Sequence, residues 1–165
     1  MFNRKKIGGS SIFTSPAAWE STFIAASDTV PVLDMQIIND FNETEQRVCI
    51  HVQTEYLADL DRHLKLAVYV TEDSIVGYQK NNNSSLGPVP DWPDYVFMHV
   101  LRGTVNGTWG EDLSTSLVTE GTKIISNYKL ILNSNWEDNN CHIIAFVYDA
   151  DTDQILMAAE KKLEP

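Results

Sequence analysis

Most of the chain alternates apolar and polar residues with a period of two, which is typical of strands with one buried face. Leu33, Met35 and Ile37 begin this alternation, and it returns after short turns rich in aspartate and asparagine. Short polar connections between such runs are typical of an antiparallel sheet. About eight segments have this character: residues 33–37, 48–56, 64–71, 74–80, 95–101, 122–132, 141–148 and 154–162.

The pattern predicts an all-β fold, an antiparallel β-sandwich of about eight strands with an immunoglobulin-like or jelly-roll-like arrangement. A closed barrel with a ligand cavity is the alternative, because alternation alone does not separate the two. Residues 95–101 are apolar on both faces, so we expect a strand buried on both sides, and residues 95–102 and 122–132 should supply the core. Residues 81–94 contain three prolines and a glycine, which predicts an irregular loop.

The beginning of the chain lacks this alternation. Ser15 and Pro16 suit the start of a helix, and apolar residues recur after them at helical spacing. The glycines and serines of residues 8–11 predict a linker before that helix. We therefore divide the chain into residues 1–30, a linker with a short helix that packs on the sandwich, and residues 31–165, the β-sandwich domain.

The net charge of the chain limits its possible functions more than it limits its possible folds. The 165 residues carry a net charge of −11, and a domain this acidic is unsuited to nucleic acid because it repels phosphate. The basic residues 4–6 are too few to change this and read as a solvated linker. The sequence has no run of about 18 apolar residues, so we expect no transmembrane segment, and its start lacks the apolar stretch of a signal peptide.

Motifs that carry catalysis are missing from the sequence. It has no nucleophile elbow, C-x-x-C pair, phosphate-binding loop or dinucleotide fingerprint, so we expect no enzymatic activity and no cofactor. An enzyme would need a cleft with paired carboxylates. Cys49 and Cys141 lie in alternating runs, where the choice is between buried free thiols and one disulfide that bridges strands.

One turn resembles the beginning of a calcium-binding loop. Asp149, Asp151 and Asp153 alternate there, and Glu160 occupies the twelfth position. Gln154, however, replaces the glycine that permits the sharp turn of such a loop, and the flanking segments are strands instead of helices. We interpret the three aspartates as a solvated hairpin turn and keep calcium as the alternative. The four histidines show no metal-ligand spacing, so we expect them to be structural.

Three tryptophans fall in predicted turns or loops. Trp92, Trp109 and Trp136, together with the nearby Tyr95, are the candidate binding residues, since exposed aromatic rings stack on sugars or anchor partner proteins. The alternative is that each ring folds back as a lid over a sheet end. We expect the turn at residues 106–107 to hold Trp109 as such a plug, which leaves Trp92 and Trp136 as the stronger candidates.

Residues 95–111, YVFMHVLRGTVNGTWGE, resemble the signature of the twenty-eight-kilodalton outer-membrane-protein family, a β-rich domain of cell-envelope lipoproteins of Gram-negative anaerobes. Residues 54–57 and 64–79 are similar to that family as well, and so is the final hairpin. The matching positions of the signature and the hairpin are Tyr95, His99, Val100, Leu101, Arg102, Asn106, Gly107, Gly110, Ala145, Phe146, Val147, Leu156, Ala158 and Lys162.

This resemblance implies a place in the cell envelope, at the outer-membrane surface or in the periplasm. It also implies that a lipid anchor, and in many relatives a thioredoxin-like domain, precedes this region in the full-length protein. It supplies no catalytic residues. We therefore expect a non-catalytic envelope domain that mediates protein or surface interaction, as an adhesin or receptor. The alternative is a glycan-binding β-sandwich module that uses the loop tryptophans.

Overall fold

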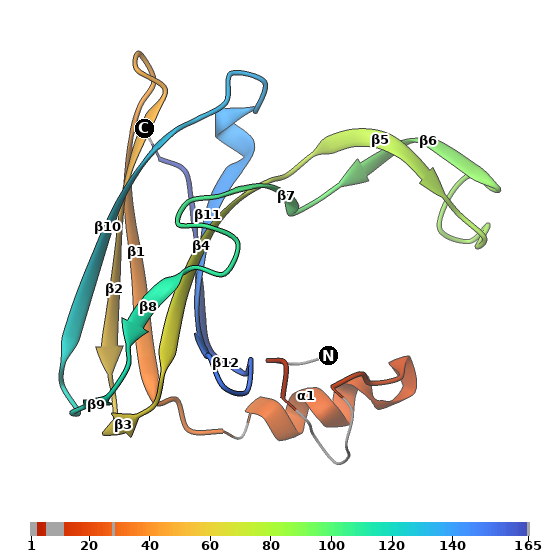
Figure 1. Ribbon diagram of the computed structural model, residues 1–165. Helices are drawn as coiled ribbons and strands as arrows, with labels where there is room; N and C mark the ends of the chain where they lie inside the picture. The colour runs from red at the N-terminus through yellow and green to blue at the C-terminus, as the bar shows by residue number, and fades with distance from the viewer. Residues whose placement is uncertain (1–2, 6–11, 28, 165) are drawn as a thin grey trace.

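The computed structural model describes residues 3–5, 12–27 and 29–164, and the linker predicted at residues 8–11 lies outside these ranges. The described residues form twelve strands and one α-helix, and the long strands make two layers (Figure 1). The two layers confirm the antiparallel sandwich that the alternation predicts. They also decide against one closed sheet, since the strands belong to separate sheets within the described residues.

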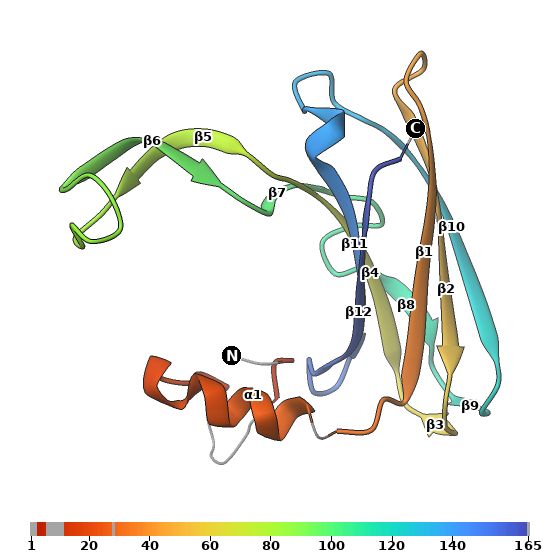
Figure 2. The ribbon, with the colours of Figure 1, turned by 180° about the vertical axis from the view of Figure 1, so that it is seen from behind.

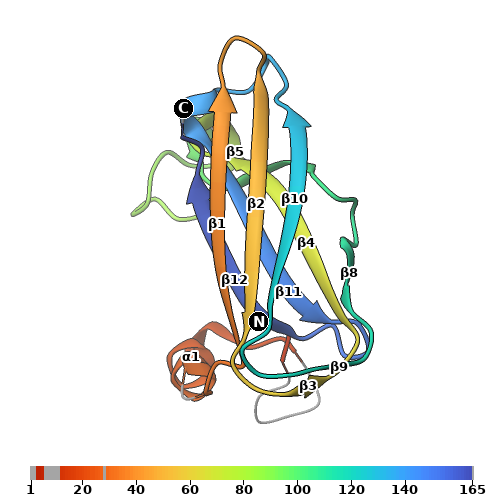
Figure 3. The same ribbon diagram turned by 90° about the vertical axis from the view of Figure 1, so that its left-hand side faces the viewer.

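The first sheet contains three long antiparallel strands in the order β1-β2-β10 (Figure 3). They are β1 (Leu33–Asn42), β2 (Arg47–Tyr56) and β10 (Lys123–Ile131). Every second residue of β1 is buried, which is the period that the sequence shows for this segment. One face of the sheet therefore packs inward and the other faces solvent.

The second sheet has the order β12-β11-β4-β7, with a further short strand, β8, paired to the start of β4. The strands are β4 (Leu64–Glu72), β7 (Val100–Thr104), β8 (Glu111–Ser114), β11 (Cys141–Asp149) and β12 (Ile155–Lys162). The core lies between the two sheets, where Ile50, Val68 and Ile143 are each completely buried. Truncating one such side chain to alanine costs about 2–5 kcal/mol.

Asn106 fills the gap on β4 between β7 and β8. Its carboxamide accepts from the Val68 backbone N–H and donates to the Leu66 carbonyl, at 2.9 Å each. Four residues on, Gly110 lies so close to β4 that a Cβ atom would stand 2.1 Å from the Leu66 carbonyl oxygen. The asparagine and the glycine of the family signature are thus structural: one continues the ladder of hydrogen bonds, and the other permits close approach.

The two cysteines are free thiols, so the alternative of a strand-bridging disulfide is wrong. Cys141 points into the core from the second sheet, whereas Cys49 lies on the first sheet and is partly exposed. Burial, with a smaller contribution from the Glu72 carboxylate, raises the pKa of the Cys141 thiol to about 12.

The N-terminal helix forms but packs less tightly than expected. A 3-10 turn, Pro16–Ala18, leads into α1 (Trp19–Ser27), in agreement with the predicted start. Within α1 only Thr22 is buried, while Trp19 and Phe23 are 54% and 59% exposed. Figure 2 shows the helix beside the base of the sandwich and not across either sheet. Beneath the sandwich, β3 (Leu60–Asp61) pairs with β9 (Leu117–Val118).

The prediction that residues 95–101 form one buried core strand is wrong. This segment is divided between β6 (Asp91–Phe97) and β7, and Val96 and Leu101 are 48% and 61% exposed. The division falls at His99, whose φ of 53° is left-handed, and Ser74, between β4 and β5, is left-handed too, with a φ of 63°. The backbone bends at both positions, and β5 (Ile75–Lys80) and β6 leave the sandwich as a separate two-stranded sheet.

Candidate functional site

The two-stranded sheet projects far from the sandwich (Figures 1 and 2). We call residues 75–97 the arm: it contains β5, the tip loop and β6. The arm and α1 extend from the same side of the molecule, the side away from the first sheet. The loop predicted at residues 81–94 is the tip of the arm, although β6 already begins within it at Asp91.

One face of the arm carries a ladder of three aromatic rings, Trp92, Tyr95 and Phe97. Their centroids are 5.2 Å apart for the first pair and 4.8 Å for the second, and both pairs meet edge to face. Phe97 also covers Gly77, where a Cβ atom would lie 3.3 Å from the ring. Edge-to-face pairs stabilise by about 0.5–1.5 kcal/mol each beyond their burial. The ladder therefore supports a hairpin that has no sheet beneath it.

The tip of the arm encloses a pocket of about 370 Å³. Its lining combines two aromatic rings with hydrogen-bonding side chains: Gln79, Lys80, Asn81, Leu86, Trp92 and Tyr95. The Asn81 carboxamide holds the loop closed by donating to the carbonyls of Gly87 and Pro88, both at 3.1 Å. Trp92 lies against Gly87, where a Cβ atom would stand 2.3 Å from the indole. Trp92 and Tyr95, both predicted as binding residues, are thus brought together.

An ion pair closes the base of this tip. The ammonium of Lys80 lies 2.6 Å from the Asp91 carboxylate, which also accepts a short hydrogen bond from the Tyr78 hydroxyl. The Lys80 hydrogen bond lowers the pKa of Asp91, and the carboxylate in turn raises the pKa of Tyr78. Because all three groups are open to water, this network sets local geometry more than stability.

The opposite face of the arm is apolar and open to solvent. Val76 pairs with Val96 across the two strands, Tyr78 continues the same face, and Met98 adds to it directly after the end of the arm. These four side chains are 48–62% exposed. We call them the exposed face of the arm.

Two histidines and two carboxylates meet where the arm joins the sandwich, and we call these four residues the arm root. His142 Nδ1 lies 2.6 Å from the Glu160 carboxylate, and its Nε2 lies 3.5 Å from Asp73. His99 faces the same two carboxylates at 3.5 Å. Sequence reasoning missed this cluster because its members come from four separate segments, and no spacing along the chain connects them.

Trp136 is a structural residue as well as a candidate for binding. The Arg102 guanidinium stands 5.5 Å above its ring, and a Cβ atom on Gly103 would be 3.4 Å from it. Arg102 is itself fixed by an ion pair of 3.1 Å with Glu72, which is 7% exposed. The signature arginine thus holds Trp136 over the end of the second sheet.

Trp109 is exposed, so the expectation that it plugs the fold is wrong. Its side chain is 70% accessible although its turn is firmly anchored. The backbone carbonyls of Thr108 and Trp109 accept hydrogen bonds of 2.6 and 2.7 Å from Tyr69 and Tyr148. The backbone of the turn is fixed, and the indole points away from it into solvent. Trp109 therefore joins the arm residues as an accessible candidate.

In the aspartate turn, the protein itself occupies both carboxylate oxygens of Asp149. Asp149 is buried, and one of its oxygens accepts the backbone N–H groups of Asp151 and Thr152, at 3.0 Å each. The other lies 3.5 Å from Arg62. Within residues 3–5, 12–27 and 29–164, no three histidine, cysteine or acidic side chains are grouped so as to hold a metal ion. The Asp153 backbone N–H also donates to the Asp149 carbonyl, so residues 149–153 form a hydrogen-bonded turn.

Fold and geometry together define an acidic antiparallel β-sandwich that carries a projecting aromatic arm. A family model described as "Outer membrane protein Omp28" matches residues 3–165, and the chain belongs to this family. Membership places the chain in the cell envelope, as the resemblance implies. In the described part of the chain, no helix is long and apolar enough to cross a membrane.

Among solved structures, a domain of the outer membrane lipoprotein Omp28 from Porphyromonas gingivalis is similar, with a TM-score of 0.55 and 22% identity. The match covers 83% of this chain and 92% of that one, and at this identity it speaks for the fold alone. Two structures of β-glucosidase from Kluyveromyces marxianus, one with glucose, reach TM-scores of only 0.33 and 0.34. They share 18% and 17% identity over 82% and 87% of this chain, and 14% and 17% of theirs. No similar protein was found among curated proteins.

Proposed function

We propose that this chain is a non-catalytic interaction domain of the cell envelope and that the exposed face of the arm contacts a protein partner. The observation that carries the proposal is where exposed apolar side chains gather. Six of the 18 large hydrophobic residues that are exposed in the described chain fall within residues 76–98. Concentrations of exposed apolar surface of this kind mark protein interaction sites.

The construction of the arm supports this role. An isolated two-stranded hairpin is only marginally stable in water, and this one is stabilised by the aromatic ladder on one face. The other face takes no part in that support, so Val76 and Val96 are available to a partner. Such a face suits an adhesin or receptor role, with a lipid anchor and a thioredoxin-like domain upstream in the full-length protein.

Two matched double variants test whether the exposed face of the arm contacts a protein partner. Val76→Ser with Val96→Ser removes apolar surface from the arm, and Ile125→Ser with Ile131→Ser removes it from β10, where both isoleucines are also more than half exposed. Each immobilised protein is exposed to solubilised outer-membrane proteins, and the bound species are quantified by mass spectrometry. We expect one or more bound species to be lost with the arm variant and retained with the β10 variant. Equal losses, or none, would refute the arm as the contact surface.

A second candidate function, glycan binding, is favoured by the tip pocket. Trp92 and Tyr95 offer ring surfaces beside the Gln79 carboxamide and Lys80, and protein sites for sugars combine aromatic stacking with such hydrogen-bonding groups. The pocket and the exposed face of the arm are distinct surfaces, so the two functions are separable by mutation.

A glycan array, followed by variants on any hit, tests this second candidate. Trp92→Ala removes the stacking ring but also the side chain packed on Gly87, so Gln79→Ala is the matched variant that leaves the ladder intact. If the tip binds the glycan, both pocket variants should bind it more weakly, and the Val76→Ser, Val96→Ser protein should bind it as the parent protein does. Binding that survives both pocket variants would exclude the tip.

A further inference from the structure

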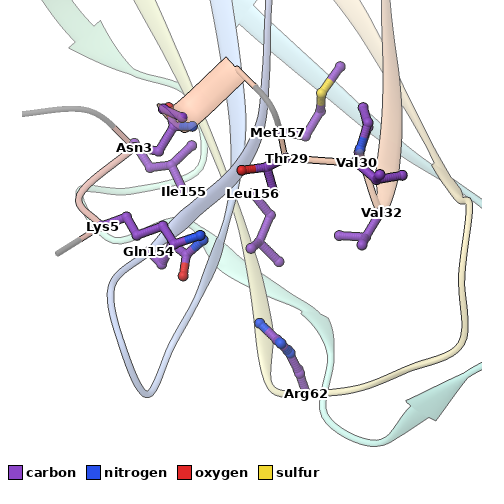
Figure 4. Close-up of a pocket in the computed structure, with 12 residues that line it drawn as sticks. Asn3, Lys5, Thr29, Val30, Val32, Arg62, Gln154, Ile155, Leu156 and Met157 are labelled. Carbon is purple, nitrogen blue, oxygen red and sulfur yellow. The ribbon is translucent and has the colours of Figure 1, made fainter. Parts of the chain in front are cut away.

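A second pocket lies at the base of the sandwich, and Figure 4 shows the side chains that line it. Its volume is about 380 Å³, within the range of small-molecule sites. The start of the described chain, the residues that follow α1, and the first residues of β12 form its walls. A hydrogen bond of 2.9 Å from the Ile155 backbone N–H to the Asn3 carbonyl attaches the N-terminal segment to β12.

The apolar part of this pocket's lining is aliphatic. Val30, Val32, Leu156 and Met157 are among its twelve lining residues, none of which is aromatic. The tip pocket, by contrast, is built on two rings. A lining of branched aliphatic side chains with a flexible methionine suits an alkyl chain better than a planar ring or a sugar.

The charge of the rim is opposite to that of the protein. Lys5 and Arg62 belong to the lining, and no carboxylate does, in a chain with 23 acidic residues. Lys5 is exposed where it lines the pocket. Arg62 has one contact of 3.5 Å with Asp149, whose other oxygen is taken by backbone N–H groups. The remaining guanidinium N–H groups of Arg62 can serve an anion.

We propose that this pocket binds a long-chain carboxylate of the fatty-acid type. The Arg62 guanidinium and the Lys5 ammonium hold the carboxylate, and the Gln154 amide flanks them. The alkyl chain lies along Val32 and Leu156. This site is remote from the arm and independent of any partner of the arm, so it goes beyond the proposed function. A protein of the cell envelope works beside lipid, where such amphiphiles partition.

Calorimetric titration of the full chain with decanoate tests the proposal. 1-Decanol, which has the chain without the charge, and acetate, which has the charge without the chain, are the comparison ligands. We expect saturable binding of decanoate at one site, binding of decanol weaker by about tenfold, and no binding of acetate, because decanol lacks the charged hydrogen bonds and acetate lacks the alkyl chain. Absence of decanoate binding, or equal binding of decanol, would overturn the proposal.

Two valine variants locate the site. Val30→Glu puts a carboxylate on the rim at a position that is 80% exposed, so the fold does not depend on it. Val76→Glu makes the same change on the arm, at a position that is 62% exposed. We expect Val30→Glu to weaken decanoate binding by about fivefold or more and Val76→Glu to leave it unchanged. Equal affinities of the two variants, with equal thermal melts, would place the ligand elsewhere and overturn the proposal.

Discussion

The Asp73 carboxylate accepts a hydrogen bond of 2.6 Å from the backbone N–H of His99, a residue 26 positions further along the chain. The bond crosses the point where the arm leaves the sandwich. His99 and Ser74, one in each of the two segments that join the arm to the sandwich, both have left-handed backbone conformations. A single side chain thus fixes two adjacent bends and, through them, the direction of the arm.

We therefore expect Asp73→Ala to loosen the arm without unfolding the sandwich. Removing the acceptor loses this hydrogen bond and leaves the His99 N–H to water, at a cost of about 1 kcal/mol. Hydrogen exchange followed by mass spectrometry should show faster exchange across residues 75–97 and unchanged protection in β1 and β2. The control is Asp94→Ala, which removes an exposed carboxylate from β6. Similar exchange in both variants would show that Asp73 does not fix the arm.

Gly110→Ala should destabilise the whole domain. The new Cβ would meet the Leu66 carbonyl oxygen at 2.1 Å, and the backbone is left-handed with a φ of 65°. We expect a loss of about 3 kcal/mol or more, since β4 is central to the second sheet. Gly121→Ala is the control: its φ is 80°, but a Cβ there has open space, so the cost is about 1 kcal/mol. Equal melting temperatures for the two variants would contradict this account.

The buried thiol of Cys141 should make the protein sensitive to alkali. Its pKa is about 12 in the folded state, so the unfolded chain loses this proton first as the pH rises above 9.0, the ordinary value. Its contribution to stability is complete below that value and is lost toward the folded pKa, by on the order of 1 kcal/mol per pH unit. Burial and the hydrogen bond with Glu111 raise the pKa of Tyr128 to about 12, which adds to the effect.

Denaturant titrations at about pH 8 and about pH 10.5 measure this sensitivity. Cys141→Ala should lose less stability between the two pH values than the parent protein, whereas Cys49→Ala should follow the parent. An identical pH dependence in all three proteins would rule out the Cys141 contribution.

Truncation of Trp136 should destabilise the protein much more than truncation of Trp109. Trp136→Ala removes the ring that stacks under Arg102 and covers Gly103, so we expect a loss of about 2–3 kcal/mol in unfolding free energy. Trp109→Ala removes a side chain that is 70% exposed, and its effect should remain within about 0.5 kcal/mol. Chemical denaturation compares them directly. A larger loss for Trp109→Ala would mean that its indole packs in solution.

Much of the fold follows from the sequence because period-two alternation reports which face of a strand is buried. β1 and β11 lie where the alternation predicts them, and the signature residues Asn106 and Gly110 prove to be structural. The additional strands arise where one predicted segment divides at His99 and where short pairs, such as β3 with β9, form within predicted turns. Strands of two residues, such as β3 and β9, are too short to show a period of two in the sequence.

The candidate site was harder to foresee. Residues 95–97 are apolar on both faces, which normally indicates a buried strand, yet here one face carries the ladder and the other is exposed. The alternation does not distinguish a buried core strand from a projecting hairpin, because the backbone bends at Ser74 and His99 determine which of the two forms. The arm root depends equally on three-dimensional pairing, because His142 meets Asp73 only through the register of β11 with β4.

A hairpin that projects from its domain has two edges whose backbone groups invite further strands, a hazard for polymerisation. The arm carries several features that oppose such growth. Pro93 removes one backbone N–H from β6, the register of β5 shifts between Gly77 and Gln79, and Lys80 and Asp91 place charges at the far end. The arm is therefore ill suited to take up a strand from a neighbour. Copies of the protein crowded together in an envelope would not join through these strand edges, and recognition by the arm would depend on side chains.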